Sequence, residues 1–72
     1  MNTTQTEEKI SRISDILEQI DKLNNMVKFH KNESGELSMM HQYQAMRSDF
    51  LEELQTLFTQ FDITVKIGEL AA

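Results

Sequence analysis

The two histidines are the side chains of this chain best suited to acid–base or metal chemistry near neutral pH. His30 and His41 stand on either side of Gly35, so a chain reversal at the glycine would bring them close together. With Glu33 or Glu36 supplying oxygen, they would form a metal site of nitrogen and carboxylate ligands. Neither Glu-x-x-His nor His-x-x-x-His occurs in the sequence, so His30 and His41 are weak metal candidates, and we expect no cofactor.

Methionine is the second residue type that could bind an ion. Four of the five methionines gather on the two sides of Gly35: Met26, Met39, Met40 and Met46. The run Met39-Met40-His41 would offer two thioethers and an imidazole, a soft ligand set that suits Cu(I). Methionine also fills irregular gaps in apolar cores, and we favour this structural role.

Phe29 is the most conspicuous candidate for a contact with another protein. It lies about 160° around the expected helix from Ile13, on a face that is otherwise charged. An exposed phenylalanine beside methionines is typical of a partner site, which predicts a patch of Met26, Phe29, Leu37 and Met39. Two alternatives remain open. Single exposed apolar residues are common, and a loosened helix end could fold Phe29 over the turn.

No set of residues indicates an enzyme. The sequence holds no cysteine, no recognisable activated nucleophile and no glycine-rich phosphate loop. Twelve acidic against seven basic residues give a net charge of -5, which disfavours binding to nucleic acid. No stretch approaches the roughly 18 consecutive apolar residues of a membrane span, and the first residues lack the pattern of a signal peptide. We therefore expect a cytoplasmic protein with no membrane contact.

Two long amphipathic helices, over residues 5–31 and 36–61, are expected to carry these residues. In each segment, apolar side chains recur at steps of three and four, which keeps them on one side of a helix. Proline is absent, and Gly35 confines the break to a short connection of the kind that joins antiparallel helices. The predicted fold class is all-α: a two-helix hairpin forming one domain over residues 1–72, with a flexible N-terminus over residues 1–4.

Residues 62–72 follow a different pattern. Apolar β-branched residues alternate with polar ones between Asp62 and Gly68, which is typical of a half-buried strand. We expect an extended or β-like tail. A lone strand must pair with a second copy, add to the sheet of a partner, pack on the helices or stay disordered.

Both apolar stripes are too wide for one neighbouring helix to cover. Each spans about 140° of its helix, more than the narrow line of contacts in a two-stranded coiled coil. Two hairpins closing into a four-helix bundle would cover the remainder through a two-fold interface. We therefore expect a homodimer, with a higher oligomer as the alternative. The expected oligomer core comprises Ile10, Ile13, Leu17, Ile20, Met46, Phe50, Leu51, Leu54 and Phe58.

Asn24 and Arg47 interrupt the two stripes at levels that face each other across the hairpin. They could form a buried polar layer that fixes register and oligomeric state. The alternative, which we favour, lays the Arg47 stem on the core and its guanidinium in water near Asp21.

These observations favour a small, non-enzymatic structural or protein-interaction module that associates with itself and engages another protein through its turn or tail. One alternative is a metal-binding helical protein that uses His30, His41 and the neighbouring methionines. The other is a small nucleic-acid-binding regulator, which the acidic charge disfavours.

Overall fold

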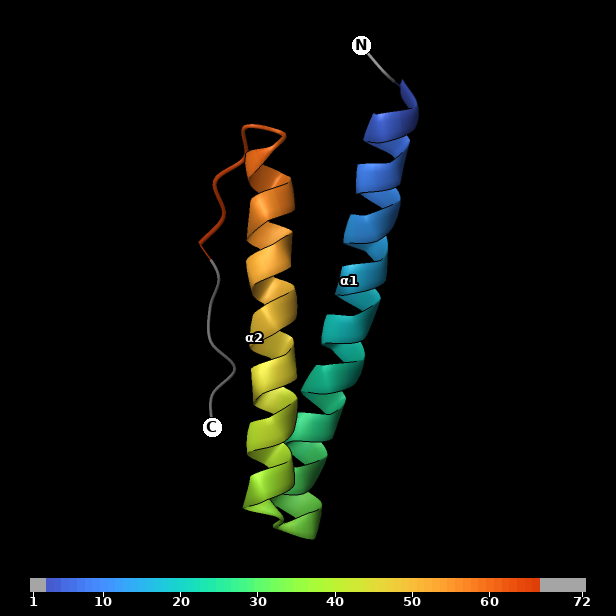
Figure 1. The fold of residues 1–72 in the computed structure, drawn as a ribbon. Helices are drawn as coiled ribbons and strands as arrows, with labels where there is room; N and C mark the ends of the chain where they lie inside the picture. The colour runs from blue at the N-terminus through green and yellow to red at the C-terminus, as the bar shows by residue number, and fades with distance from the viewer. Residues whose placement is uncertain (1–2, 67–72) are drawn as a thin grey trace.

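The chain folds as two antiparallel helices that lie side by side (Figure 1). This computed structural model describes residues 3–66. Helix α1 spans Thr3–Phe29, a π-helical turn η1 spans His30–Ser34, and helix α2 spans Leu37–Thr59. The prediction of an all-α, two-helix hairpin is confirmed. Of the N-terminus predicted to be flexible over residues 1–4, Thr3 and Thr4 form the start of α1, and residues 1–2 lie outside the described chain.

The chain reverses between His30 and Glu36, which we call the closed end of the hairpin. After α1, η1 adds one wider turn of the kind that accommodates an extra residue in a helix. Gly35 then adopts φ 69°, in the left-handed region where a Cβ atom is unfavourable. The Glu36 carbonyl accepts a 3.0 Å hydrogen bond from the Met40 amide and so opens α2. The break therefore falls where the sequence predicted it, at the one glycine near the middle.

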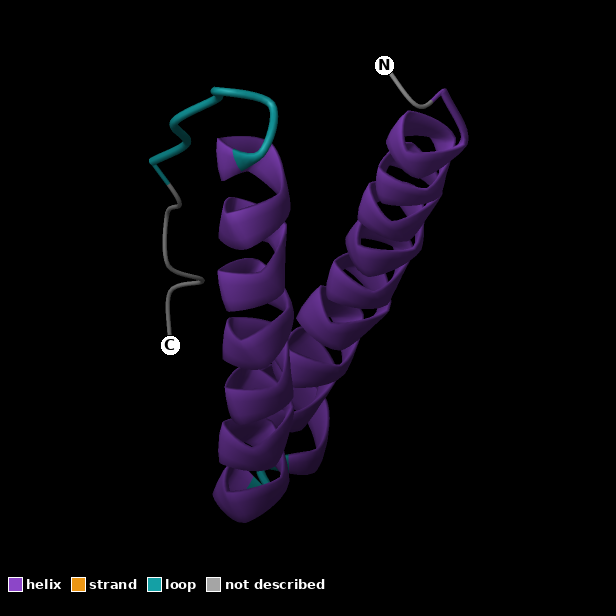
Figure 2. Ribbon diagram, turned by 45° about the horizontal axis from the view of Figure 1, so that its top comes forward, coloured by secondary structure: helices purple, strands orange, loops and turns teal. Residues whose placement is uncertain are grey.

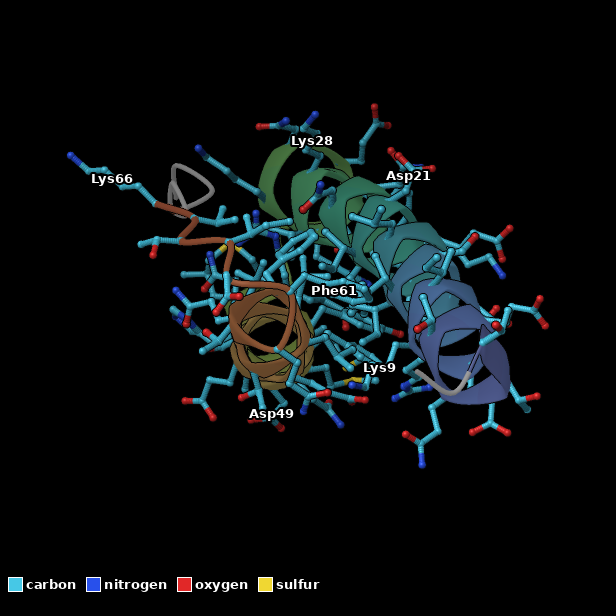
Figure 3. The ribbon with its side chains drawn as sticks, turned by 90° about the horizontal axis from the view of Figure 1, so that it is seen from above. Lys9, Asp21, Lys28, Asp49, Phe61 and Lys66 are labelled. Carbon is cyan, nitrogen blue, oxygen red and sulfur yellow. The ribbon has the colours of Figure 1, made fainter. Side chains whose placement is uncertain are left out.

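The hairpin core lies along the facing sides of the two helices. Its central cluster consists of Ile16, Ile20 and Leu54, with Ile13, Phe50, Leu51, Leu57 and Phe58 packed against it. Leu23, Val27, Met40 and His30 are buried as well. Away from the closed end the helices diverge (Figure 2), so the start of α1 and the end of α2 form an open end. There the Lys9 Nζ atom lies 5.9 Å from the centre of the Phe61 ring (Figure 3).

Helix α2 ends in a capping turn that reverses the chain. The Ile63 amide donates to the Phe58 carbonyl and the Asp62 amide to the Thr59 carbonyl, both at 3.0 Å. Asp62 has φ 58°, so these bonds form a Schellman motif with aspartate in the left-handed position. The following residues run back beside α2 (Figure 1). Of the tail predicted over residues 62–72, residues 63–66 have no regular secondary structure, and residues 67–72 lie outside the described chain.

Candidate functional site

The polar contacts Arg12–Glu53 and Asn24–Arg47 between the helices mark opposite faces of the hairpin. Arg12 Nε and Nη2 donate to the two carboxylate oxygens of Glu53 at 2.6 and 2.7 Å. Arg47 Nε donates to Asn24 Oδ1 at 2.6 Å. On α1, the fully buried Ile16 lies about 40° around the helix from Arg12 and about 80° from Asn24, in opposite directions. The two contacts therefore border the buried line between the helices on its two sides.

The face marked by Asn24 and Arg47 is apolar toward the open end. Ile10 and Leu17 precede Asn24 by two and by one heptad, so the three share one side of α1. Leu51 and Phe58 follow Arg47 on the corresponding side of α2 and are partly buried. We call these six residues the Asn24 face. Ile10 is 56% exposed and Leu17 is 50% exposed, so half of each side chain has no cover within the described chain.

The border of the Asn24 face carries few acidic residues on the two helices. By helical spacing, Gln44, Ser48 and Gln55 line it on α2, all of them uncharged. Asp21 borders it on α1. Viewed down the helices in Figure 3, Asp21, Lys28 and Lys66 lie on one side of the hairpin and Asp49 on the opposite side. The side of Asp21 and Lys28 is the side of the Asn24 face, so residues 63–66 run back over the α2 part of that face. By helical spacing, Asp15, Asp49 and Glu53 lie toward the opposite face, so more acidic side chains of α1 and α2 border that face than the Asn24 face.

The opposite face carries the ion pair and most of the methionines. Met46 precedes Glu53 by one heptad and is 43% exposed, so it lies on the side of Arg12. The hydrogen bond from Arg12 lowers the pKa of the Glu53 carboxyl and raises the pKa of the guanidinium. Met46 was predicted to share one oligomer core with Ile10 and Leu17, and the structure places it on the other face of the hairpin.

The remaining residues of the expected oligomer core are covered to different extents within the single hairpin. Ile20 and Leu54 are buried at the centre of the core and have little surface to offer a partner. Four more are partly buried against that centre: Ile13, Phe50, Leu51 and Phe58. The uncovered apolar surface of the predicted set is thus concentrated at Ile10, Leu17 and Met46.

His30 is built into the closed end. Its side chain is 7% exposed, and its ring stacks on Tyr43 with centroids 5.5 Å apart and planes 9° apart. Its Nδ1 atom is hydrogen-bonded to Ser34 Oγ at 2.7 Å, across the π-helical turn. Its Nε2 atom is buried and has no hydrogen-bond partner among residues 3–66. This arrangement could not be predicted from the sequence, because it depends on a turn one residue wider than an α-helical turn.

The two histidines make separate contacts. His41 is exposed, and its Nδ1 atom lies 3.3 Å from Gln44 Oε1 on the same helix. Within the part of the chain that the structure describes, no group of three or more histidine, aspartate or glutamate side chains is placed to hold a metal ion. His30 and His41 are therefore not brought together as a ligand set in the described residues.

The predicted partner patch at the closed end is divided between two sides. Met26 lies two heptads after Arg12 on α1, and Met39 lies two heptads before Glu53 on α2, so both are on the face of the ion pair. Both are partly buried. Phe29 is half-exposed and meets the edge of the His30 ring. Leu37 is exposed, but it lies about 160° around α2 from Met39. It does not extend that patch.

Comparisons with protein-family models, curated proteins and solved structures found no match to this chain. Neither of the described helices has the combination of length and apolar character that crossing a membrane requires.

Proposed function

We propose that the protein is a cytoplasmic, non-enzymatic structural or interaction module that pairs with a second copy of itself through the Asn24 face, forming a four-helix bundle. The supporting observation is the half-exposed Ile10 and Leu17, in a row on one side of α1 beside the partly buried Leu51 and Phe58. Complete burial of such a side chain is worth about 1.5–3 kcal/mol, so covering the exposed half of each contributes about 1 kcal/mol. A two-fold dimer gains this contribution from both copies.

The dimensions of the hairpin suit such an interface. Its Cα atoms extend over 49 × 20 × 13 Å, so the molecule is long and flat. The broad side can supply the roughly 800 Å² per partner that a stable protein–protein interface buries. A single thin hairpin has little interior of its own, and a second layer of helices is the common way to complete such a structure.

Charge also favours this face over the opposite one. Two copies with a net charge of -5 each repel one another unless the surfaces that meet are nearly free of acidic groups. The Asn24 face has uncharged glutamine and serine at its border on α2, whereas the opposite face carries Arg12 and Glu53. The metal-binding alternative has less support, because His30 and His41 are engaged in different contacts.

Sedimentation equilibrium of three proteins tests the proposal: the unchanged chain, Leu17→Gln and Met46→Gln. We expect the unchanged chain to be a dimer at micromolar concentration. Leu17→Gln places a polar amide in the interface twice and should weaken the dimer by roughly ten- to a hundred-fold, since each 1.4 kcal/mol is a factor of about ten. Met46→Gln makes a similar change on the other face and should leave the dimer intact.

Far-UV circular dichroism of each variant confirms that the helices remain. A folded, unchanged chain that stays monomeric at about 100 µM, a concentration at which a contact of only about 5.5 kcal/mol would already associate, would contradict the proposal. Equal weakening by Leu17→Gln and Met46→Gln would contradict the choice of face.

A further inference from the structure

We infer that the two hairpins pair with their closed ends at the same end of the bundle, so that both Asn24–Arg47 contacts join in one polar layer between the copies. This inference rests on the proposed self-association and adds its orientation. It follows from where polar and apolar residues lie along the Asn24 face.

The Asn24 face is divided along its length. At 1.5 Å per helical residue, Asn24 lies about 10 Å from Leu17 and about 21 Å from Ile10, toward the closed end. Arg47 lies at the level of Asn24, to which it is bonded at 2.6 Å. The open half of the face is therefore apolar, and a polar layer crosses it nearer the closed end.

Two hairpins can meet face to face with two-fold symmetry in two ways. If the symmetry axis runs along the helices, each level of one hairpin meets the same level of the other, and α1 lies over α2 of the second copy. If the axis runs across the helices, α1 lies over α1 of the second copy, and these two helices point in opposite directions. The closed end of one copy then covers the open end of the other.

The first arrangement matches the chemistry at every level. Ile10 and Leu17 meet the apolar levels of the second copy, and Asn24 meets the partner's Arg47. The Arg47 guanidinium has five N–H groups and uses one of them in its hydrogen bond to Asn24. The Asn24 amide keeps two N–H groups and a lone pair for further hydrogen bonds. In this arrangement α1 and α2 alternate around the four-helix bundle, and so do Asn24 and Arg47. The two guanidinium groups are then on diagonally opposite helices, with the Asn24 amide oxygens between them.

The second arrangement leaves either Arg47 without a hydrogen-bond acceptor or part of the apolar surface uncovered. With full overlap, Arg47 lies opposite an apolar level of the other copy, and a buried guanidinium without an acceptor is strongly unfavourable. Sliding the copies until the polar layers coincide leaves Ile10 and Phe58 uncovered. The position of Asn24 and Arg47 away from the middle of the hairpin thus selects the first arrangement. It also brings both closed ends together, with Phe29 of each copy at the same end of the bundle.

Distances between spin labels distinguish the two arrangements. The chain has no cysteine, so single labels can be placed at Glu33→Cys in the closed end, Glu7→Cys near the open end and Glu18→Cys at mid-height. Helical spacing places Glu7 and Glu18 about 60–120° around α1 from the row of Ile10, Leu17 and Asn24, on its outer side, and all three labelled positions are exposed. Label-to-label distances are then measured by pulsed electron paramagnetic resonance on the dimer.

We expect all three labels to give distances of roughly 20–30 Å, the width of a bundle with helix axes about 10 Å apart. In the second arrangement the Glu33→Cys and Glu7→Cys pairs would be roughly 40 Å or more apart, given about 1.5 Å per residue on each side of the middle. The Glu18→Cys pair stays short in both and serves as the control.

Long or mixed distances at the two ends, with a short distance at Glu18→Cys, would overturn the inferred orientation and leave the dimer standing. No distance in any of the three, together with a monomer in sedimentation, would overturn the proposed function itself. Sedimentation and circular dichroism of the labelled chains show that the labels leave the fold and the association unchanged.

Discussion

Arg47 Nε donates a 2.6 Å hydrogen bond to Asn24 Oδ1, tying α2 to α1 across 23 positions of sequence. Asn24 occupies the heptad position that Leu17 and Ile10 fill closer to the open end. A polar pair thus interrupts an otherwise apolar row, on the face proposed to meet a second copy. Such pairs in helical bundles fix alignment at a cost in stability.

Replacing the pair by Asn24→Leu and Arg47→Leu together should tighten the dimer and remove its single orientation. The double change leaves no unpaired amide or guanidinium behind, so the whole face becomes apolar. We expect a dissociation constant lower by about ten-fold, the equivalent of about 1.4 kcal/mol. The spin-label distances at Glu33→Cys should then include a long component.

The matched control removes the contact between Arg12 and Glu53, through Arg12→Leu and Glu53→Leu together. That pair lies on the opposite face, so association and label distances should stay as they are. Unchanged affinity and one short distance in the Asn24 and Arg47 double variant would show that this pair does not set the alignment.

The buried His30 ring gives a prediction about stability. Its Nε2 atom is buried with no hydrogen-bond partner in residues 3–66, and an unpaired polar atom of this kind costs about 1–3 kcal/mol. His30→Phe keeps an aromatic ring against Tyr43 and removes that atom, at the loss of the bond to Ser34 worth about 1 kcal/mol. We expect the free energy of unfolding in urea to stay equal or rise by about 1 kcal/mol.

His30→Ala is the control for packing. It removes the ring and should lower the free energy of unfolding by about 2–4 kcal/mol, as other aromatic deletions in cores do. If His30→Phe is as destabilising as His30→Ala, then the polar atoms of His30, and not its ring, stabilise the closed end.

Much of the fold followed from the spacing of apolar residues and from one glycine. The steps of three and four identified both helices, and Gly35 located the reversal, because the backbone there needs a left-handed residue. The helix ends were less predictable. Thr4 and Glu7 have the spacing of a capping box, in which the two side chains bond the first backbone amides of a helix, yet α1 already includes Thr3. The widened turn at His30–Ser34 has no sequence signal.

The faces of the hairpin were harder to predict than its helices. Wide apolar stripes show that more than one neighbour is needed, but they do not say which edge of each stripe stays uncovered. That depends on how the two helices are rotated against each other, and the contacts Arg12–Glu53 and Asn24–Arg47 report the rotation. Arg12 and Glu53 are 41 positions apart, and each looks like an ordinary surface charge in the sequence.

The end of α2 offers a stabilising substitution. Asp62 holds φ 58° in the capping turn, where an L-residue is unfavourable by about 1–2 kcal/mol, somewhat less for aspartate. Its negative charge also lies at the negative end of the helix dipole. We expect Asp62→Gly to raise the free energy of unfolding by about 0.5–1 kcal/mol, after the entropy cost of glycine.

Asp62→Asn separates the effect of the charge on stability from the effect of the left-handed backbone. It removes the charge and keeps a residue that tolerates the left-handed region, so it should gain a few tenths of a kcal/mol. Urea unfolding at one fixed chain concentration measures both variants, since the stability of a dimer depends on concentration. A loss of stability in Asp62→Gly would mean that the aspartate side chain makes a contact that outweighs the backbone strain.

The ion pair between Arg12 and Glu53 predicts how stability falls in acid. The hydrogen bond from Arg12 places the pKa of Glu53 in the folded chain below its ordinary value of 4.5. The contribution of this carboxylate to stability is therefore fully present above about pH 4.5 and is lost as the pH falls through the lowered, folded pKa. Because both side chains are almost half exposed to water, the effect should be small and should weaken further with added salt.

Thermal unfolding of the unchanged chain, Glu53→Gln and Glu52→Gln between about pH 3 and pH 7 measures this contribution. Glu52 is the exposed neighbour of Glu53 and faces away from α1 by helical spacing, so its replacement should leave the acid dependence nearly as it is. Glu53→Gln should lose stability at pH 7 and show a shallower fall toward pH 3, because the group that takes up the extra proton on unfolding is gone. Parallel pH profiles for the unchanged chain and Glu53→Gln would mean that the pair stabilises the hairpin by packing or neutral hydrogen bonding alone, and that its charge has no part in holding α1 against α2.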